Sequence, residues 1–185
     1  MDRRQFIQAG SAASVLGLAS GCATTGGSSG GKVVVVGGGY GGATAAKYLR
    51  MWSNGAIDVT LVEPNDVFIS CPISNLVLGG SKQIADVTVP YENLAKRHGV
   101  KLAKDTAVGI DLEKRQVRLA GGTTLPYDRL VLSPGVEFLW AALPGLTKPG
   151  AQDRVLHAWK AGAQTVALRK QLEAARHDDK TFSDW

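Results

Sequence analysis

The 185-residue sequence predicts an α/β domain with a parallel sheet, and three patterns support this prediction. Val33–Val36 form a β-branched apolar run, which is typical of a strand buried on both faces. Ala43–Met51 then supply good helix formers, and a second apolar run follows at Ile57–Val62. A strand, a helix and a second strand in this order indicate a parallel βαβ unit.

Between the first strand and the helix, three glycines have the spacing G-x-G-x-x-G. We expect Gly37 to make a tight turn, Gly39 to let a pyrophosphate approach the backbone, and Gly42 to let the helix pack close to the strand. The helix N-terminus offers N–H groups and a partial positive charge to phosphates. A turn without a ligand is the alternative, but the flanking strand and helix favour a dinucleotide site.

Glu63 ends the second apolar run, about 20 residues after the last glycine of the motif. A carboxylate at this position accepts hydrogen bonds from ribose hydroxyls and repels a ribose 2′-phosphate. It therefore favours FAD or NAD over NADP. The alternative is a surface carboxylate at a strand end.

The remaining pattern adds further parallel strands and an antiparallel meander. The predicted elements are a short helix or ordered loop at Ile73–Leu78, a helix at Tyr91–His98 closed by Gly99, a parallel strand at Val100–Ala103, antiparallel strands at Ala107–Asp111 and Gln116–Leu119 leading into Thr123–Pro126, a buried strand at Leu130–Leu132, and an amphipathic helix at Ala161–Ala175. On the last helix we expect Val166, Leu168 and Leu172 on the apolar side, and Arg169 and Lys170 on the solvated side. Such a meander separates the third and fourth parallel strands in two-dinucleotide-binding flavoproteins.

Composition argues against several other classes of protein. The net charge is +5, but Lys and Arg are scattered and form no basic run with interleaved aromatic residues, so nucleic-acid binding has little support. No apolar stretch reaches the roughly 18 residues that a membrane span needs. No metal site is predicted.

Residues 1–31 have the layout of a signal peptide followed by a flexible Gly/Ser/Thr-rich tether. Arg3 and Arg4, followed by Phe6 and Ile7, resemble the twin-arginine motif, which exports folded, cofactor-loaded proteins to the periplasm. The alternative is a disordered tail with two accidental arginines.

Cys22 ends the stretch Leu18–Cys22, which resembles a bacterial lipobox with its leucine one place early. Lipidation at Cys22 would be the chain's contact with a membrane. Simple cleavage of the leader and an inert cysteine stay open as alternatives.

Several blocks of the sequence resemble the flavoprotein subunit of flavocytochrome c sulfide dehydrogenase. The matching blocks are the twin-arginine leader, Lys32–Leu49, Val59–Asn65, Ser70–Gly80, Tyr127–Gly135 and His157–Glu173. The resemblance extends to about Arg176 and implies a periplasmic FAD-dependent oxidoreductase that passes electrons from sulfide to a c-type cytochrome subunit. It also implies a Rossmann-like FAD-binding domain at 32–140, incomplete here, and a linker with the first helix of a second dinucleotide-type domain at 141–185.

The resemblance assigns roles to individual residues. Gly37, Gly39, Gly42 and Glu63 would hold the ADP part of FAD, the backbone of Ala107 would face the adenine, and Gly135 would lie near the flavin pyrophosphate. His157 and Trp159 match the family. We expect Trp159 to pack against the sheet, and His157 to be a packed or surface imidazole rather than a general base.

Cys71 falls where the family bonds its flavin through sulfur to the 8α-methyl carbon, so the resemblance implies covalent FAD. A thiolate is the nucleophile that such attachment needs. Chemistry alone would treat a lone cysteine as a small buried hydrophobe.

From Asp179 onward the residues depart from the family pattern. The family's redox-active cysteine pair has no counterpart here, so no catalytic residue is assigned and a truncated fragment with weak flavin binding is expected. A sulfide:quinone reductase or an NADH dehydrogenase of the same architecture is the first alternative. A non-catalytic, exported nucleotide-binding module is the second.

Overall fold

The computed structural model describes residues 30–177, and both the twin-arginine motif and Cys22 lie outside this part of the chain. The described elements, in chain order, are β1 (Lys32–Val36), α2 (Tyr40–Trp52), β2 (Asp58–Val62), β3 (Val67–Ile69), α3 (Asn75–Leu78), η1 (Ile84–Val87), β4 (Thr88–Pro90), α4 (Glu92–His98), β5 (Lys101–Ala103), β6 (Ala107–Asp111), β7 (Gln116–Leu119), β8 (Thr124–Pro126), β9 (Arg129–Leu132), η2 (Trp140–Ala142), η3 (Pro144–Thr147), α5 (Ala151–Arg154) and α6 (Ala163–His177).

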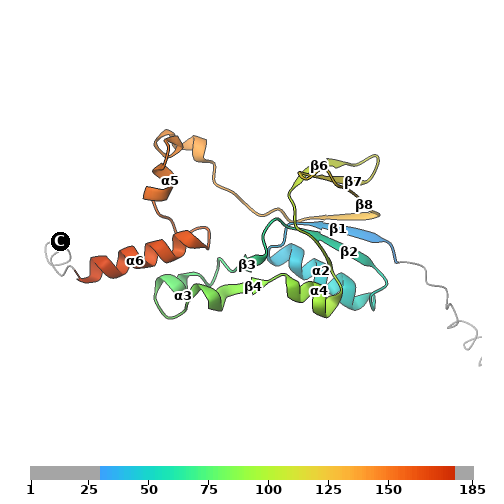
Figure 1. Cartoon of the computed structure of the whole chain (residues 1–185), viewed down its shortest axis with the longest axis horizontal. Coiled ribbons are helices and arrows are strands. Elements are labelled where there is room, and N and C mark those ends of the chain that lie inside the picture. The colour runs from blue at the N-terminus through green and yellow to red at the C-terminus, as the bar shows by residue number, and fades with distance from the viewer. Residues whose placement is uncertain (1–29, 178–185) are drawn as a thin grey trace, which may run out of the picture.

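A four-stranded parallel sheet in the order β5-β2-β1-β9 forms the centre of the fold (Figure 1). The predicted α/β class and βαβ unit are therefore confirmed. Successive residues of β1 pack on opposite faces, as the pleat of a strand requires. Val33 and Val35 belong to a core cluster on the side of α2 and α4, whereas Val34 belongs to a second cluster beneath the meander.

The antiparallel meander β6-β7-β8 was predicted correctly, and it covers the second face of the sheet (Figure 1). Its buried residues Val117 and Leu119 join the cluster that contains Val34 and Val62. The chain then enters β9, which pairs with β1 in parallel, so the meander lies between the third and fourth parallel strands as expected. The predicted closure of α4 by Gly99 is also confirmed, with Gly99 in the left-handed conformation at φ 66°.

A two-stranded antiparallel sheet, β3-β4, was not predicted. Each of its strands has three residues, too few to show an alternating pattern. The sheet carries the chain from β2 to the turn at Cys71.

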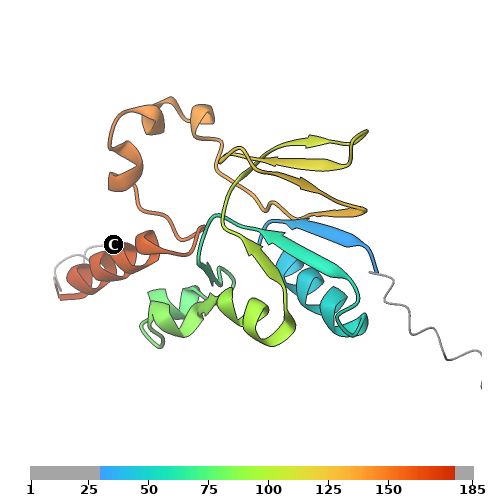
Figure 2. The same cartoon turned by 45° about the vertical axis from the view of Figure 1, so that its right-hand side comes forward.

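After β9 the chain leaves the sheet, passes through η2, η3 and α5, and returns along α6 beside α3 (Figures 1 and 2). The expected solvation of Arg169 is wrong. Its guanidinium is half-buried and donates to the Leu78 carbonyl at the end of α3, at 2.9 Å. Lys170 is exposed as expected, while Leu172 is 49% exposed although an apolar contact was expected.

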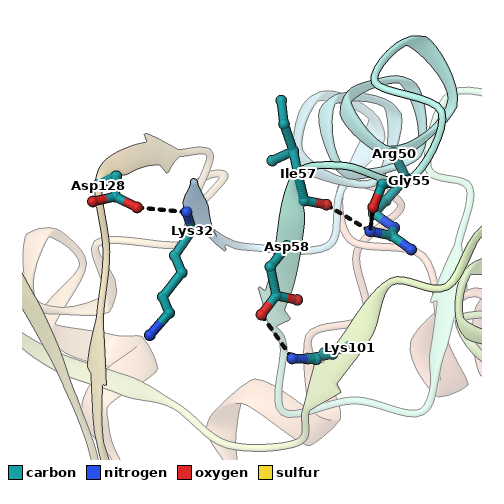
Figure 3. A network of polar contacts seen from close by, with 7 residues as sticks. All are labelled: Lys32, Arg50, Gly55, Ile57, Asp58, Lys101 and Asp128. Carbon is teal, nitrogen blue, oxygen red and sulfur yellow. Dashed lines mark hydrogen bonds and ion pairs between the residues drawn. The ribbon is translucent and has the colours of Figure 1, made fainter. Parts of the chain in front are cut away.

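The edge of the sheet where the parallel strands begin is tied together by polar contacts (Figure 3). Arg50 donates to the carbonyls of Gly55 and Ile57, both at 2.6 Å, and of His98 at 3.0 Å. Two further contacts join neighbouring strands: Asp128 accepts from the Lys32 N–H at 2.6 Å, and Lys101 pairs with Asp58 at 2.7 Å. This edge is structural, which leaves the opposite edge for a ligand, as is usual in open α/β sheets.

Candidate functional site

A cleft of about 570 Å³ lies where the parallel strands end. It brings together four of the predicted site residues, Gly39, Glu63, Cys71 and Gly135, from separate parts of the chain. The other lining residues are Asn65, Val67, Phe68, Ile69, Tyr91, Pro134, Val136, Glu137, Phe138, Trp159, Lys160 and Ala161.

The three motif glycines have different surroundings. A Cβ on Gly37, whose φ is +94°, would lie 2.0 Å from the Ser133 carbonyl oxygen, and a Cβ on Gly42 would lie 1.8 Å from the Gly37 carbonyl oxygen. A Cβ on Gly39 would meet no atom within 4 Å. Gly37 and Gly42 therefore permit close packing of β1, α2 and β9, while Gly39 faces open space at the N-terminus of α2.

The Glu63 carboxylate is held by the residues around it. Its Oε2 accepts from the Gly38 N–H at 2.8 Å, and its Oε1 accepts from both the backbone N–H and the Nδ2 of Asn65, at 3.1 and 2.7 Å. A carboxylate offers about four acceptor positions, so one remains, on Oε2. Glu63 thus lies ready to accept from a hydroxyl in the cleft.

Tyr91 stabilises the glycine turn through a hydrogen bond, a role that the sequence analysis missed. The side chain is only 6% exposed, and its hydroxyl donates to the Gly38 carbonyl at 2.8 Å. Burial, followed by the nearby Glu63 carboxylate, raises the pKa of Tyr91 to about 12. The signal in the sequence was a tyrosine at the start of a predicted helix that leads into a buried strand. Such a position favours burial of the side chain, and a buried hydroxyl needs a hydrogen-bond partner.

Cys71 is exposed at the cleft wall, so its reading as a buried small hydrophobe is wrong. Its thiol donates to the Trp159 carbonyl, and its own carbonyl accepts from the Ser74 hydroxyl at 2.7 Å. The preceding Ser70 is buried and its hydroxyl bonds the hydroxyl of Tyr40, next to the glycine turn. The position of the thiol is therefore linked to α2.

Residues 157–162 lie next to Cys71 and contribute Trp159, Lys160 and Ala161 to the cleft wall. Trp159 is 66% exposed and lines the cleft, so the expectation that it packs against the sheet is wrong. His157 is packed, as expected, with its ring centroid 4.5 Å from that of Phe138. Within the described residues, its Nδ1 has no hydrogen-bond partner.

Gly37, Gly42 and Ala107 are the predicted site residues that do not line this cleft, and Ala107 lies apart from the glycine turn. It lies in β6 opposite Leu119 and packs against the core beneath the meander. A neighbouring cleft of about 460 Å³ shares Glu63, Asn65, Val67 and Tyr91 with the first and extends to Leu102 and Lys104. The two clefts adjoin at these four shared residues, and we refer to them together as the groove.

A separate hollow lies away from the predicted site residues. A hollow of about 630 Å³ on the meander is lined largely by polar and charged residues and contains none of the predicted site residues. Residues 30–177 contain no cluster of three metal-ligating side chains. No helix in that range combines the length and apolar character that crossing a membrane requires.

These residues fit a dinucleotide cofactor, because open space at Gly39, a fixed carboxylate and a helix N-terminus adjoin one groove. The sequence model of the pyridine nucleotide-disulphide oxidoreductase family matches residues 31–177. The chain belongs to this family of FAD-dependent oxidoreductases.

Relatives within and around this family share sequence or fold with the chain. The flavoprotein chain of sulfide dehydrogenase (flavocytochrome c) from Chlorobaculum thiosulfatiphilum is 61% identical over 38 residues, which are 20% of this chain and 77% of that sequence. The sulfide:quinone oxidoreductase of Aquifex aeolicus has 24% identity and a TM-score of 0.65, over 80% of this chain and 32% of that one. The water-forming NADH oxidase of Lactobacillus brevis has 29% identity and a TM-score of 0.62, over 77% and 32%. The chain thus spans about a third of the structural relatives' length.

Proposed function

We propose that this chain forms the FAD-binding part of a sulfide dehydrogenase flavoprotein that passes electrons to a c-type cytochrome. The observation that carries this proposal is the cleft that joins the glycine turn, Glu63 and the exposed thiol of Cys71. The 38-residue match to a sulfide dehydrogenase flavoprotein chain supports the choice of substrate. We assign residues 32–140 to the FAD-binding domain, and residues 141–185 to a linker and the first helix of a second domain.

Different residues of the groove would bind different parts of FAD. The N-terminus of α2 and the open backbone at Gly39 would receive the pyrophosphate, and Glu63 Oε2 would accept from a ribose hydroxyl. Gly135 would lie beside the pyrophosphate, and we retain the backbone of Ala107 as the contact for the adenine. When bound, FAD supplies two-electron redox chemistry, while the protein supplies position and electrostatics.

Cys71 is the residue that we propose to attach the cofactor covalently. Formation of the thioether replaces the S–H bond of Cys71 and one C–H bond of the flavin 8α-methyl group with a C–S bond. Two protons are released, and the two electrons pass through the ring to an electron acceptor such as dioxygen. The exposed thiol at the cleft wall supports this assignment, because a buried thiol could not reach a ligand.

Acid denaturation of purified holoprotein tests the attachment. We expect yellow flavin to stay with the precipitated wild-type protein, and to appear wholly in the supernatant of Cys71→Ser. A Cys22→Ser variant is the matched control, since it removes the other cysteine and should keep its bound flavin. Complete release of flavin from the wild type would refute the thioether.

Electron-acceptor assays on the whole protein with its partner subunit test the reaction. Sulfide-dependent reduction of cytochrome c is the expected result. Reduction of a quinone would instead indicate a sulfide:quinone reductase, and oxidation of NADH an NADH dehydrogenase. A stable, colourless protein that binds nucleotide would indicate a non-catalytic module.

We further propose export to the periplasm by the twin-arginine route. Changing both Arg3 and Arg4 to Lys should retain the protein in the cytoplasm, as measured by cell fractionation. Labelling cells with a radioactive fatty acid tests lipidation at Cys22: label that persists in Cys22→Ser would exclude this cysteine as the anchor.

A further inference from the structure

We propose that Tyr91 is a positioning residue that sets the direction of the Gly39 N–H toward a bound phosphate. The inference rests on the proposed nucleotide site and adds a residue to it. Neither the G-x-G-x-x-G spacing nor the acid at the end of β2 predicts a role for this tyrosine.

Both backbone groups of Gly38 are held by side chains from other elements. Its N–H donates to Glu63 at the end of β2, and its carbonyl accepts from the hydroxyl of Tyr91 at the start of α4, each at 2.8 Å. Gly38 is buried and immediately precedes Gly39, which caps α2. The two contacts therefore fix the backbone just before the helix N-terminus.

The planarity of the peptide bond links Tyr91 to Gly39. The described chain contains no cis peptide, so the carbonyl of Gly38 and the N–H of Gly39 point in opposite directions across one rigid plane. Holding the carbonyl on Tyr91 directs the Gly39 N–H away from Tyr91. Since a Cβ on Gly39 would meet no atom within 4 Å, there is room for a phosphate at this residue.

Tyr91 fills the space beside Gly38. A Cβ on Gly38 would lie 2.5 Å from the Tyr91 hydroxyl oxygen. The hydroxyl therefore occupies the space beside the turn, and it carries its proton across the physiological range, since its pKa of about 12 lies far above that range. It acts as a permanent donor to the Gly38 carbonyl.

Binding of three probes by Tyr91→Phe separates positioning from simple support. The variant keeps the ring and removes one donor. In apoprotein that carries Cys71→Ser, where no thioether can form, we expect the Kd for FAD and for ADP to rise about five- to tenfold, the usual effect of one hydrogen bond. The Kd for adenosine, which has no phosphate, should stay unchanged. An equal loss for adenosine, or no loss for ADP, would overturn the proposal. Tyr127→Phe is the matched control, because Tyr127 is buried in the cluster beneath the meander.

A second measurement examines the turn without any cofactor. With ¹⁵N-labelled glycine, the Gly39 amide resonance should move in Tyr91→Phe and stay in place in Tyr127→Phe; an unmoved resonance would refute the positioning role. If the wild type binds neither FAD nor ADP, the proposed function is refuted. The glycine resonance still tests whether Tyr91 positions the turn, because it needs no ligand.

Should Tyr91→Phe not fold, wild-type chain labelled with 3-fluorotyrosine provides the test. Its Tyr91 ¹⁹F signal should shift with ADP but not with adenosine, and the reverse result would reject the proposal.

Discussion

Gly37 and Gly39 belong to one motif, yet their surroundings demand glycine for different reasons. Gly37 has a positive φ and meets the backbone of Ser133, whereas Gly39 has φ −63° and open space around it. The fold requires glycine at the first position, whereas we propose that a bound pyrophosphate requires it at the second. The spacing alone predicts the motif but does not separate these roles.

Alanine at Gly37 should therefore lower stability, whereas alanine at Gly39 should prevent FAD binding. Gly37→Ala should lower the free energy of unfolding by at least about 2 kcal/mol, because of the positive φ and the clash with Ser133. Gly39→Ala should change it by less than about 1 kcal/mol, yet abolish FAD binding by filling the space of the pyrophosphate. Urea unfolding and flavin titration measure the two effects. Strong FAD binding by Gly39→Ala would contradict this division.

Tyr91 should make the fold sensitive to alkaline pH. Its pKa is about 12 in the folded chain and 10 when solvated, so the unfolded chain loses the proton first. Tyr91 therefore stabilises the fold fully below pH 10, and this contribution is lost as the pH rises from 10 toward 12. Wild type should lose about 1–2 kcal/mol more than Tyr91→Phe over this window, measured by urea unfolding. Parallel stability curves for the two proteins would disprove it.

At the scale of elements, Arg50 connects the end of α2 to two other segments. Its guanidinium donates to the carbonyls of Gly55 and Ile57 in the turn into β2 (Figure 3). It also donates to the carbonyl of His98 at the end of α4. The helix propensity of residues 43–51 predicts α2 but not these contacts, because they join positions far apart in sequence.

Arg50→Met should lower the free energy of unfolding by about 2–3 kcal/mol, since three carbonyls lose a charged donor while the apolar stem is kept. Arg97→Met, an exposed change on α4, is the control and should cost less than about 0.5 kcal/mol. Equal unfolding midpoints for the two variants would show that the Arg50 contacts add no stability.

At the scale of the whole molecule, the groove is formed by two segments that are far apart in the sequence. The β3-β4 sheet and α3 carry Cys71, and the segment before α6 carries Trp159. Arg169 joins them, because it bonds the end of α3 from the middle of α6. A contact far from the thiol thus joins the elements that follow Cys71 and Trp159 in the chain.

Arg169→Met should loosen α6 from α3 and lower the fraction of flavin bound covalently at Cys71 severalfold. The cause is loss of the hydrogen bond to the Leu78 carbonyl. Hydrogen exchange along α6 should accelerate in this variant and not in the exposed Lys170→Met control. Unchanged exchange would mean that other contacts hold α6 in place.

The sequence by itself determined the α/β class, the glycine turn, the acid at the end of β2 and the meander, because these features follow from local patterns of propensity, glycine and alternation. Tertiary structure alone decided the partners of Arg50, Arg169 and Tyr91, the β3-β4 pairing, and the exposure of Cys71 and Trp159. Each of these depends on residues far apart in sequence, and neither periodicity nor spacing records which segments meet.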